Sequence, residues 1–175
     1  MTKKIELFDS NKHSGLAWAF QVSPSSCGNH EHYENYIRLI AASDYYDGMG
    51  TTHILIEENE EEKRIIGFIT LKSSSLVSKG DDMICGVPAI EITELAVDKR
   101  FERQKNGQLL LSYAIDLAGR IKNDSIGAKH VILCAEPMSV GFYEKFGFAK
   151  LSETSIIPRE GWNRNCIPMY MTLPR

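Results

Sequence analysis

The sequence predicts an α/β fold (an α+β mixed sheet) in which a central twisted mixed β-sheet of about six to seven strands carries helices on both faces. Two observations support this prediction. The apolar runs 53–57 and 64–71 flank an acidic tract, which is typical of an antiparallel hairpin with a charged turn. A helical pattern then connects the apolar runs 89–97 and 130–135, which is typical of a right-handed parallel crossover.

The elements before the hairpin are expected to be one strand and two helices. Residues 3–8 favour a short opening strand, and residues 13–22 favour a short helix. Apolar residues at three- and four-residue spacing then predict an amphipathic helix, which the glycine-containing segment 47–50 ends. The residues of this stripe are Tyr33, Tyr36, Ile37, Ile40 and Ala41.

The middle of the chain combines an irregular segment, a strand and a long helix. Residues 73–86 are expected to form an irregular excursion before the strand 89–97. From Gly107 onward, apolar residues one turn apart predict a helix, and Asn106 is expected to be its N-cap. The apolar residues of this helix are Leu110, Ala114, Leu117 and Ile121.

The C-terminal third alternates strands with one short helix. The run 130–135 is the pattern of a buried strand, and a short helix follows over 140–146. Two further strands are expected near 148–151 and 168–173. Because the chain has neither internal repeats nor a long linker, we expect a single domain over residues 1–175.

The charge balance limits the kinds of partner that the protein is expected to bind. The 20 Lys and Arg residues against 23 Asp and Glu give a net charge of -3, so no global basic field attracts nucleic acid or an anionic membrane. The N-terminus lacks the apolar region of a signal peptide, and no stretch reaches the ~18 apolar residues of a membrane span. We therefore expect a cytoplasmic protein without a membrane partner.

Cysteines and histidines do not form a metal-binding pattern in this sequence. Because the four cysteines are widely separated and form no C-x-x-C pair, we expect four reduced thiols, with Cys134 as a small core residue. His30 and His32 lie on a polar helix start without a third ligand nearby in sequence, and we interpret them as surface residues. No metal site is expected.

Two stretches carry a resemblance to a known family. Residues 92–118 read ITELAVDKRFERQKNGQLLLSYAIDLA, and residues 131–148 read VILCAEPMSVGFYEKFGF. Together they resemble the two cofactor motifs of the GNAT superfamily of N-acetyltransferases. The resemblance implies a GNAT-like fold, acetyl-CoA as the co-substrate, and direct acetyl transfer to a primary amine in a ternary complex.

The first motif implies a pyrophosphate-binding loop at the start of the long helix. Aligned on residues 95–98, the family's glutamine-or-arginine position falls on Glu102, its first glycine on Lys105 and its second on Gly107. Backbone N–H groups at a helix N-terminus bind anions, and glycine permits their close approach. The resemblance assigns this cradle to Arg103, Gln104, Lys105, Asn106, Gly107 and Gln108. On its own, Lys-Asn-Gly before a helix is also the pattern of a turn and a cap.

The resemblance implies a second contact to the cofactor, along the strand before the loop. In the family, the backbone of this strand pairs with the pantetheine arm like an added strand. Leu95, Ala96 and Val97 occupy these positions. An N–H near Val97 is expected to polarise the thioester carbonyl and to stabilise the oxyanion. The three side chains are equally consistent with an ordinary core.

Two carboxylates on this strand compete for the role of general base. Glu91 aligns with the glutamate that histone-acetylating members of the superfamily use to deprotonate an amine, whereas Glu94 is closer to the cofactor segment. We favour Glu91, and either residue alone is also consistent with a solvated strand charge.

Tyr143 is the candidate general acid. Phe142 and Phe146 lie one turn apart and are expected to face the core, which would turn Tyr143 toward the strand ends. A tyrosine with a pKa of about 10 stays protonated at neutral pH and can donate its proton to the coenzyme A thiolate. The alternative is a structural tyrosine packed against the sheet.

The only indication of the acetyl acceptor and of the protein partners is the order of the expected helices and strands. This order resembles the GNAT toxins of bacterial toxin-antitoxin pairs, which acetylate aminoacyl-tRNA. The acceptors left open are a small-molecule amine, a protein amine and aminoacyl-tRNA, and the partners left open are an antitoxin and a second copy in a homodimer. Alternative functions are a GNAT-fold pseudoenzyme deficient in acetyl-CoA binding and a toxin-like interaction module.

Overall fold

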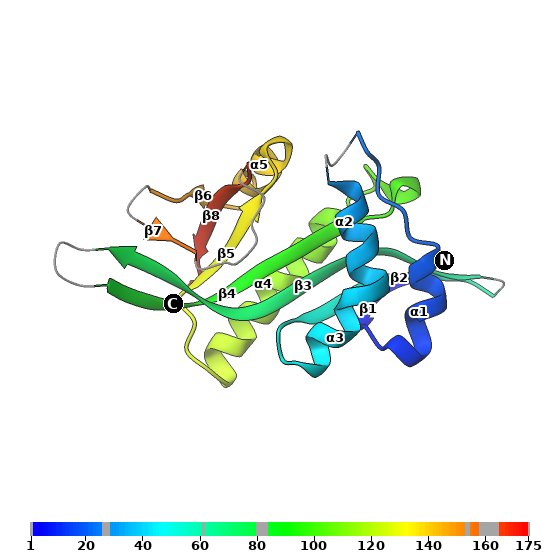
Figure 1. The fold of residues 1–175 in the computed structure, drawn as a ribbon, viewed down its shortest axis with the longest axis horizontal. Coiled ribbons are helices and arrows are strands. Elements are labelled where there is room, and N and C mark those ends of the chain that lie inside the picture. The colour runs from blue at the N-terminus through cyan, green and yellow to red at the C-terminus, as the bar shows by residue number, and fades with distance from the viewer. Residues whose placement is uncertain are drawn as a thin grey trace. The chain divides into compact units, whose positions relative to one another are not determined.

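The computed structural model describes residues 2–25, 29–60, 62–79, 84–152, 155–157 and 165–174. The chain forms two compact units, the first from Met1–Leu71 and Glu94–Ala114 and the second from Lys72–Thr93 and Ile115–Arg175. Three elements contribute residues to both units: the strand β3 (Lys63–Lys79), the strand β4 (Ile84–Val97) and the helix α4 (Asn106–Asp124). Figure 1 labels these three elements.

A mixed sheet is confirmed. Its hydrogen-bonded order is β1-β2-β3-β4-β5-β8-β6, and β7 pairs with β3 outside this path. The β4–β5 ladder is parallel, and the ladders β1–β2, β2–β3, β5–β8, β6–β8 and β3–β7 are antiparallel. The remaining bounds are β1 (Thr2–Leu7), β2 (Thr51–Glu58), β5 (His130–Ala135), β6 (Ala149–Lys150), β7 (Ser155–Ile156) and β8 (Ile167–Thr172).

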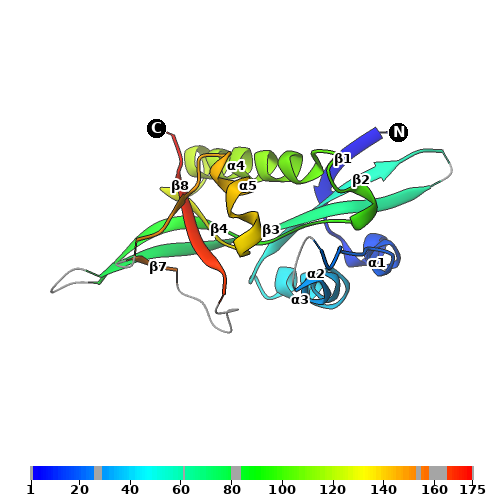
Figure 2. The ribbon, with the colours of Figure 1, turned by 90° about the horizontal axis from the view of Figure 1, so that it is seen from above.

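The helices α1 (Ser10–Trp18), α2 (His30–Asn35), η1 (Tyr36–Ile40) and α3 (Ala41–Tyr46) cover one face of the first unit, and the part of α4 that belongs to this unit lies on its other face (Figure 2). The segment η1 is a π-helix, so the predicted amphipathic helix is interrupted by a wider turn. The apolar stripe is confirmed for Tyr36, Ile37 and Ala41, which are buried in one cluster with Phe68 of β3, whereas Ile40 is 40% exposed.

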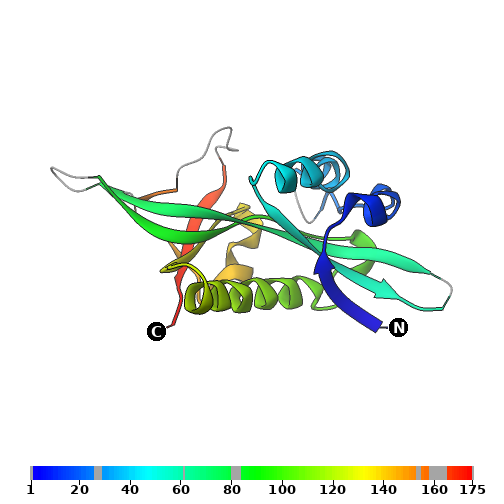
Figure 3. The ribbon, with the colours of Figure 1, turned by 90° about the horizontal axis from the view of Figure 1, so that it is seen from below.

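The first turns of α4 pack closely on β3 within this unit. A Cβ added at Gly67 would lie 2.8 Å from the Leu110 Cδ1 atom and 3.0 Å from the Ala96 carbonyl oxygen. Glycine at this position therefore lets the helix approach the strand (Figure 3).

The second unit has its own apolar cluster. Leu76 of β3, Ala89 of β4 and Ile132 of β5 are buried with Ile157. After β5 the chain continues through the 3-10 helix η3 (Pro137–Ser139) into the short helix α5 (Val140–Glu144). None of the described helices is long and apolar enough to cross a membrane.

The expected irregular excursion over residues 73–86 is wrong for its described part. Strand β3 continues to Lys79 and β4 begins at Ile84, while residues 80–83 lie outside the described residues. Polar residues form part of these strands because pairing with a neighbouring strand can outweigh a low intrinsic preference for the strand conformation. The neighbouring strands bring the Ser75 Cβ atom to 3.7 Å from the position that a Cβ of Gly86 would take.

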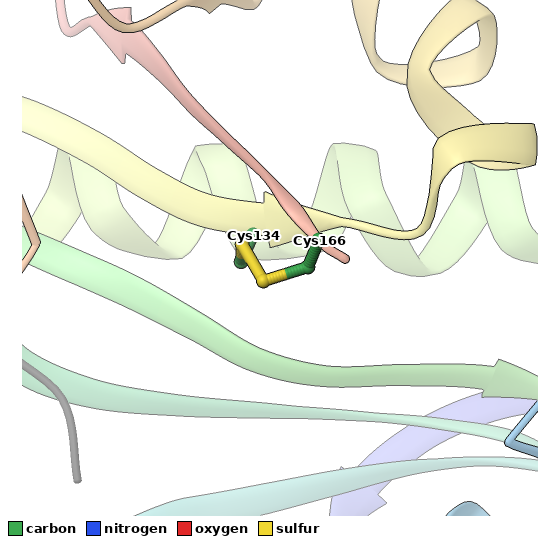
Figure 4. Close-up of a disulfide and its surroundings, with 2 residues drawn as sticks. All are labelled: Cys134 and Cys166. Atoms are coloured by element: carbon green, nitrogen blue, oxygen red, sulfur yellow. A yellow bond between two sulfur atoms is a disulfide. The ribbon is translucent and has the colours of Figure 1, made fainter. Parts of the chain in front are cut away.

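The expectation of four reduced thiols is also wrong. Cys134 and Cys166 form a disulfide with a Cα–Cα distance of 5.5 Å (Figure 4). The antiparallel β5–β8 ladder pairs Cys134 with Pro168, which brings Cys166, two residues earlier, beside it. Because the two cysteines are 32 residues apart in sequence, no local pattern predicts that they lie close together. Cys85 is free and exposed, and Cys27 lies outside the described residues.

Candidate active site

The loop between β4 and α4 has an unusual backbone. After the 3-10 helix η2 (Lys99–Phe101), Arg103 has a φ of 59° and Lys105 a φ of 62°. The left-handed conformation costs a non-glycine residue about 1–2 kcal/mol. Such strain is concentrated at functional sites, and left-handed residues in turns present consecutive N–H groups to an anion. Lys105 therefore has the backbone conformation that glycine adopts most readily.

Asp98 anchors the start of this loop. Its fully buried carboxylate accepts hydrogen bonds from the Arg100 N–H at 3.0 Å, from the Arg100 Nε at 2.8 Å and from the Gln21 N–H at 3.1 Å. Burial alone would raise the pKa of Asp98, but these hydrogen bonds and the Arg100 charge hold it below its ordinary value. The carboxylate therefore stays ionised and fixes the entry to the loop.

The N-terminus of α4 is organised differently from the prediction. The Lys105 carbonyl oxygen accepts the first helical hydrogen bond, from the Leu109 N–H at 3.0 Å, so Asn106 lies inside the helix rather than at its cap. The buried Asn106 side chain donates to the Phe101 carbonyl oxygen at 2.8 Å and accepts from the Lys3 Nζ at 3.0 Å. Asn106 thus closes the loop, and Lys3 adds a positive charge at the helix start.

The segment Leu95–Val97 extends β4 beyond the residues that pair in parallel with β5. Among the residues that the structure describes, the β4–β5 ladder pairs Ala89–Ile92 with His130–Leu133 and ends there. The Ala96 side chain is buried in the apolar cluster of the first unit. The Ala96 side chain is therefore part of the core of this unit.

Glu91 is fully buried in the second unit. Its Oε2 atom lies 3.6 Å from the Lys72 Nζ, and the Lys72 side chain is 28% exposed. Burying a carboxylate is costly unless it is paired and hydrogen-bonded. The Lys72 ammonium lies within ion-pair distance of this buried carboxylate.

Glu94 has a different partner, in the first unit. Its Oε2 atom lies 3.0 Å from the Nε2 atom of His32 on α2, and the two side chains are 13% and 42% exposed. The sequence indicated a surface role for His32, and no local signal connected it to Glu94. Only the packing of α2 on the sheet brings the two residues together.

Tyr143 is a buried residue of α5, whereas the sequence predicted that Phe142 and Phe146 face the core. Tyr143 is 8% exposed, whereas Phe142 and Phe146 are half-buried. The Tyr143 ring contacts the rings of Phe142 and Phe148 at centroid distances of 5.1 and 5.8 Å. The apolar spacing in a helix of so few residues did not determine which face is buried.

The end of α5 fixes the backbone of Tyr143. The Phe148 N–H donates to the Tyr143 carbonyl oxygen at 3.2 Å, and the Gly147 N–H donates to the Glu144 carbonyl oxygen at 3.0 Å. Gly147 has a φ of 88°. These are the two bonds and the left-handed residue of a Schellman motif, which explains the Lys-Phe-Gly-Phe sequence after the tyrosine.

The predicted site residues are divided between the two units. Leu95–Val97, Glu94 and the loop 103–108 belong to the first unit, where His32 and Lys3 join them. Glu91 and Tyr143 belong to the second unit.

Comparison with known proteins identifies the family. The sequence model described as "Acetyltransferase (GNAT) domain" matches residues 23–173. No curated protein sequence matches the chain significantly.

Several solved structures share the fold. A mutant of the toxin AtaT bound to the C-terminus of the antitoxin AtaR and acetyl-CoA is 16% identical, with a TM-score of 0.74 over 98% of this chain and 93% of that chain. A mutant of KacT is 13% identical, with a TM-score of 0.73 over 99% and 96%. AtaT complexed with acetyl-methionyl-tRNAfMet is 16% identical, with a TM-score of 0.73 over 95% and 94%. Because the family model covers most of the sequence and these structures share the fold, the chain belongs to the GNAT family of acetyltransferases.

Proposed function

We propose that the protein is an acetyl-CoA-dependent N-acetyltransferase that transfers the acetyl group to a primary amine by direct attack in a ternary complex. The observation that carries the proposal is the loop before α4, where Arg103 and Lys105 are left-handed in a chain matched by the GNAT model. The glycine pattern of the family is incomplete here, but the backbone conformation suits an anion.

The pyrophosphate of acetyl-CoA binds the backbone N–H groups of residues 103–108. The helix dipole of α4 favours an anion at this end, and the first N–H groups of a helix have no carbonyl partner within the helix. The exposed side chains of Arg103 and Lys105 and the ammonium of Lys3 add positive charge. Gln104 and Gln108 are exposed and add hydrogen-bond donors.

The pantetheine arm pairs with the backbone of Leu95–Val97. This segment lies beyond the last described pair of the β4–β5 ladder, which supports the addition of an extended ligand as a further strand. The Val97 N–H polarises the thioester carbonyl.

Tyr143 donates a proton to the thiolate as it leaves, and the Schellman motif that ends α5 holds its backbone in place for this step. Of the two carboxylates on β4, Glu91, which pairs with Lys72, is the favoured candidate base, and Glu94 is the alternative.

Aminoacyl-tRNA is the proposed acceptor and an antitoxin the proposed partner. The support is the fold shared with AtaT, for which complexes with acetyl-methionyl-tRNAfMet and with the C-terminus of AtaR are known. The net charge of -3 argues against a broad basic surface for tRNA. A small amine and a protein amine therefore belong in the same assay.

Isothermal titration with acetyl-CoA tests whether the protein binds its co-substrate. We expect a saturable heat, and no heat at millimolar ligand would favour the pseudoenzyme or interaction-module alternatives. Release of coenzyme A thiol is then measured with initiator methionyl-tRNA, methioninamide and a lysine peptide as acceptors. No thiol release with any of them, despite binding, would contradict the enzymatic proposal for these acceptors.

The variant Tyr143→Phe tests the acid. Loss of the phenol is expected to lower kcat about 100-fold or more and to leave the acetyl-CoA dissociation constant unchanged, because the proton is needed only as the thiolate leaves. Tyr46→Phe is the matched control, since Tyr46 is 73% exposed on α3. Unchanged turnover in Tyr143→Phe would remove Tyr143 from this role.

A further inference from the structure

The pair His32–Glu94 in the first unit has the geometry of a histidine oriented by a carboxylate. Glu94 is mostly buried on β4, while His32 is partly exposed on α2. The contact between His32 Nε2 and Glu94 Oε2 is 3.0 Å, which is a hydrogen-bonding distance. When Nε2 carries the proton that Glu94 accepts, the lone pair of the ring is on Nδ1.

Aromatic neighbours fix the imidazole ring. The His32 ring meets the Tyr33 ring edge-on at 5.3 Å and lies 6.3 Å from the Tyr36 ring. Tyr36 in turn stacks on Phe68 at 6.1 Å and donates a hydrogen bond to the Asp44 Oδ2 at 2.9 Å. A ring held in this way loses little freedom when it acts on a substrate.

The position of Glu94 relates this pair to the proposed thioester site. Glu94 directly precedes Leu95–Val97 on β4 and lies two residues before Ala96, a rise of about 7 Å along the strand. The pair and this segment belong to the same compact unit. An amine that attacks a thioester held by the backbone of this segment is therefore within reach of a side chain next to Glu94.

Exposure distinguishes His32 from the other candidate base. Glu91 is 0% exposed and next to Lys72, whereas His32 is 42% exposed. A base must come within hydrogen-bond distance of the proton that it removes. The exposed His32 side chain is accessible to an acceptor that arrives from solvent.

We propose that His32, oriented by Glu94, accepts the proton of the acceptor amine, an assignment that rests on the proposed acetyl transfer. The amine nitrogen forms a bond to the acetyl carbonyl carbon, and its proton moves to the imidazole. The bond between that carbon and sulfur breaks, and coenzyme A leaves as the thiolate. Glu94 is a positioning residue, because it stabilises the charged imidazole and holds its orientation.

The test compares His32→Ala with His30→Ala, which removes a neighbouring histidine of the same helix. Thiol release is measured with acetyl-CoA and either initiator methionyl-tRNA or methioninamide, and acetyl-CoA affinity is measured by titration. We expect His32→Ala to lower kcat about 100-fold or more with unchanged acetyl-CoA affinity, and His30→Ala to have wild-type turnover. Added imidazole should restore part of the activity of His32→Ala, because a free base can fill the space of the lost ring.

A double variant tests the positioning role of Glu94. Glu94→Gln alone should lower kcat without changing acetyl-CoA affinity, and combining it with His32→Ala should cause no further loss, because the two residues act as one unit. His32→Gln provides a second substitution of similar polarity, in case the alanine variant does not fold.

The outcomes separate the two proposals. Wild-type protein that binds no acetyl-CoA overturns the proposed function and, with it, the role of His32. Active wild-type protein together with an active His32→Gln variant overturns the role of His32 alone. Loss of activity that imidazole does not restore, or additive losses in the double variant, also overturns it.

Discussion

We predict that the disulfide between Cys134 and Cys166 contributes substantially to the free energy of unfolding. It joins the end of β5 to the residue before β8, and the chain between them includes α5 with Tyr143. Replacing both cysteines by serine, or reducing the bond, removes a constraint on the unfolded chain and so raises its conformational entropy. The hydrogen bonds of the β5–β8 ladder can still form in the folded chain.

The magnitude follows from the length of the closed loop. For a sequence separation of 32 residues, the chain-entropy relation gives about 12 cal/mol/K, or about 3.7 kcal/mol at room temperature. For a protein of this size, each kcal/mol changes Tm by about 2–4 °C, so Tm should fall by about 7–15 °C.

The assay is urea unfolding and thermal unfolding with and without a thiol reductant. Wild-type protein should lose stability in reductant, whereas the double serine variant should be less stable in both conditions and insensitive to reductant. Cys85→Ser is the control, because Cys85 is free and exposed, and it should respond to reductant like the wild type. Equal unfolding of wild-type protein with and without reductant would refute the reasoning.

Two further predictions concern the loop before α4. Because the pKa of Asp98 is lowered in the folded state, its contribution is present above the pKa of an unfolded aspartate, about 3.9, and is lost as the pH falls further. Asp98→Asn should therefore be less stable at neutral pH and should lack this loss in acid unfolding; an unchanged acid slope would contradict the role of the carboxylate. Lys105→Gly should raise the free energy of unfolding by up to about 1 kcal/mol, whereas Lys105→Ala should not, because alanine retains the strain. Urea unfolding of the two variants decides this, and equal stability would argue against strain at Lys105.

The sequence correctly predicted helices and strands in which the spacing of apolar residues shows which face is buried. The stripe through Tyr36 and Ile37 is buried, and the apolar run that begins at His130 is a strand. These patterns are local, because each residue's face is determined by its position along its own helix or strand. The mixed character of the sheet followed from the same patterns, because they indicated one antiparallel hairpin and one parallel crossover, whereas the strand order is known only from the structure.

Features that depend on contacts distant in sequence could not be predicted in the same way. The disulfide needs the register of β5 on β8, and His32 is separated from Glu94 by 62 residues. The burial of Tyr143 was not predicted, because α5 is too short for its apolar spacing to define one buried face. In each case a tertiary contact, rather than a local pattern, determines the environment of the side chain.

The loop at Lys105 shows why an incomplete motif does not by itself exclude a function. A motif records residues, whereas an anion is bound by the N–H groups that the backbone presents. Glycine is common in such loops because it adopts positive φ without strain, but a φ of 62° at Lys105 shows that the packed loop can impose this conformation on lysine. Asp98 and Asn106 supply part of that packing through their buried hydrogen bonds. If these contacts maintain the conformation, acetyl-CoA affinity should depend more on Asp98 than on the presence of glycine, and the lysine ammonium adds a charge that glycine lacks.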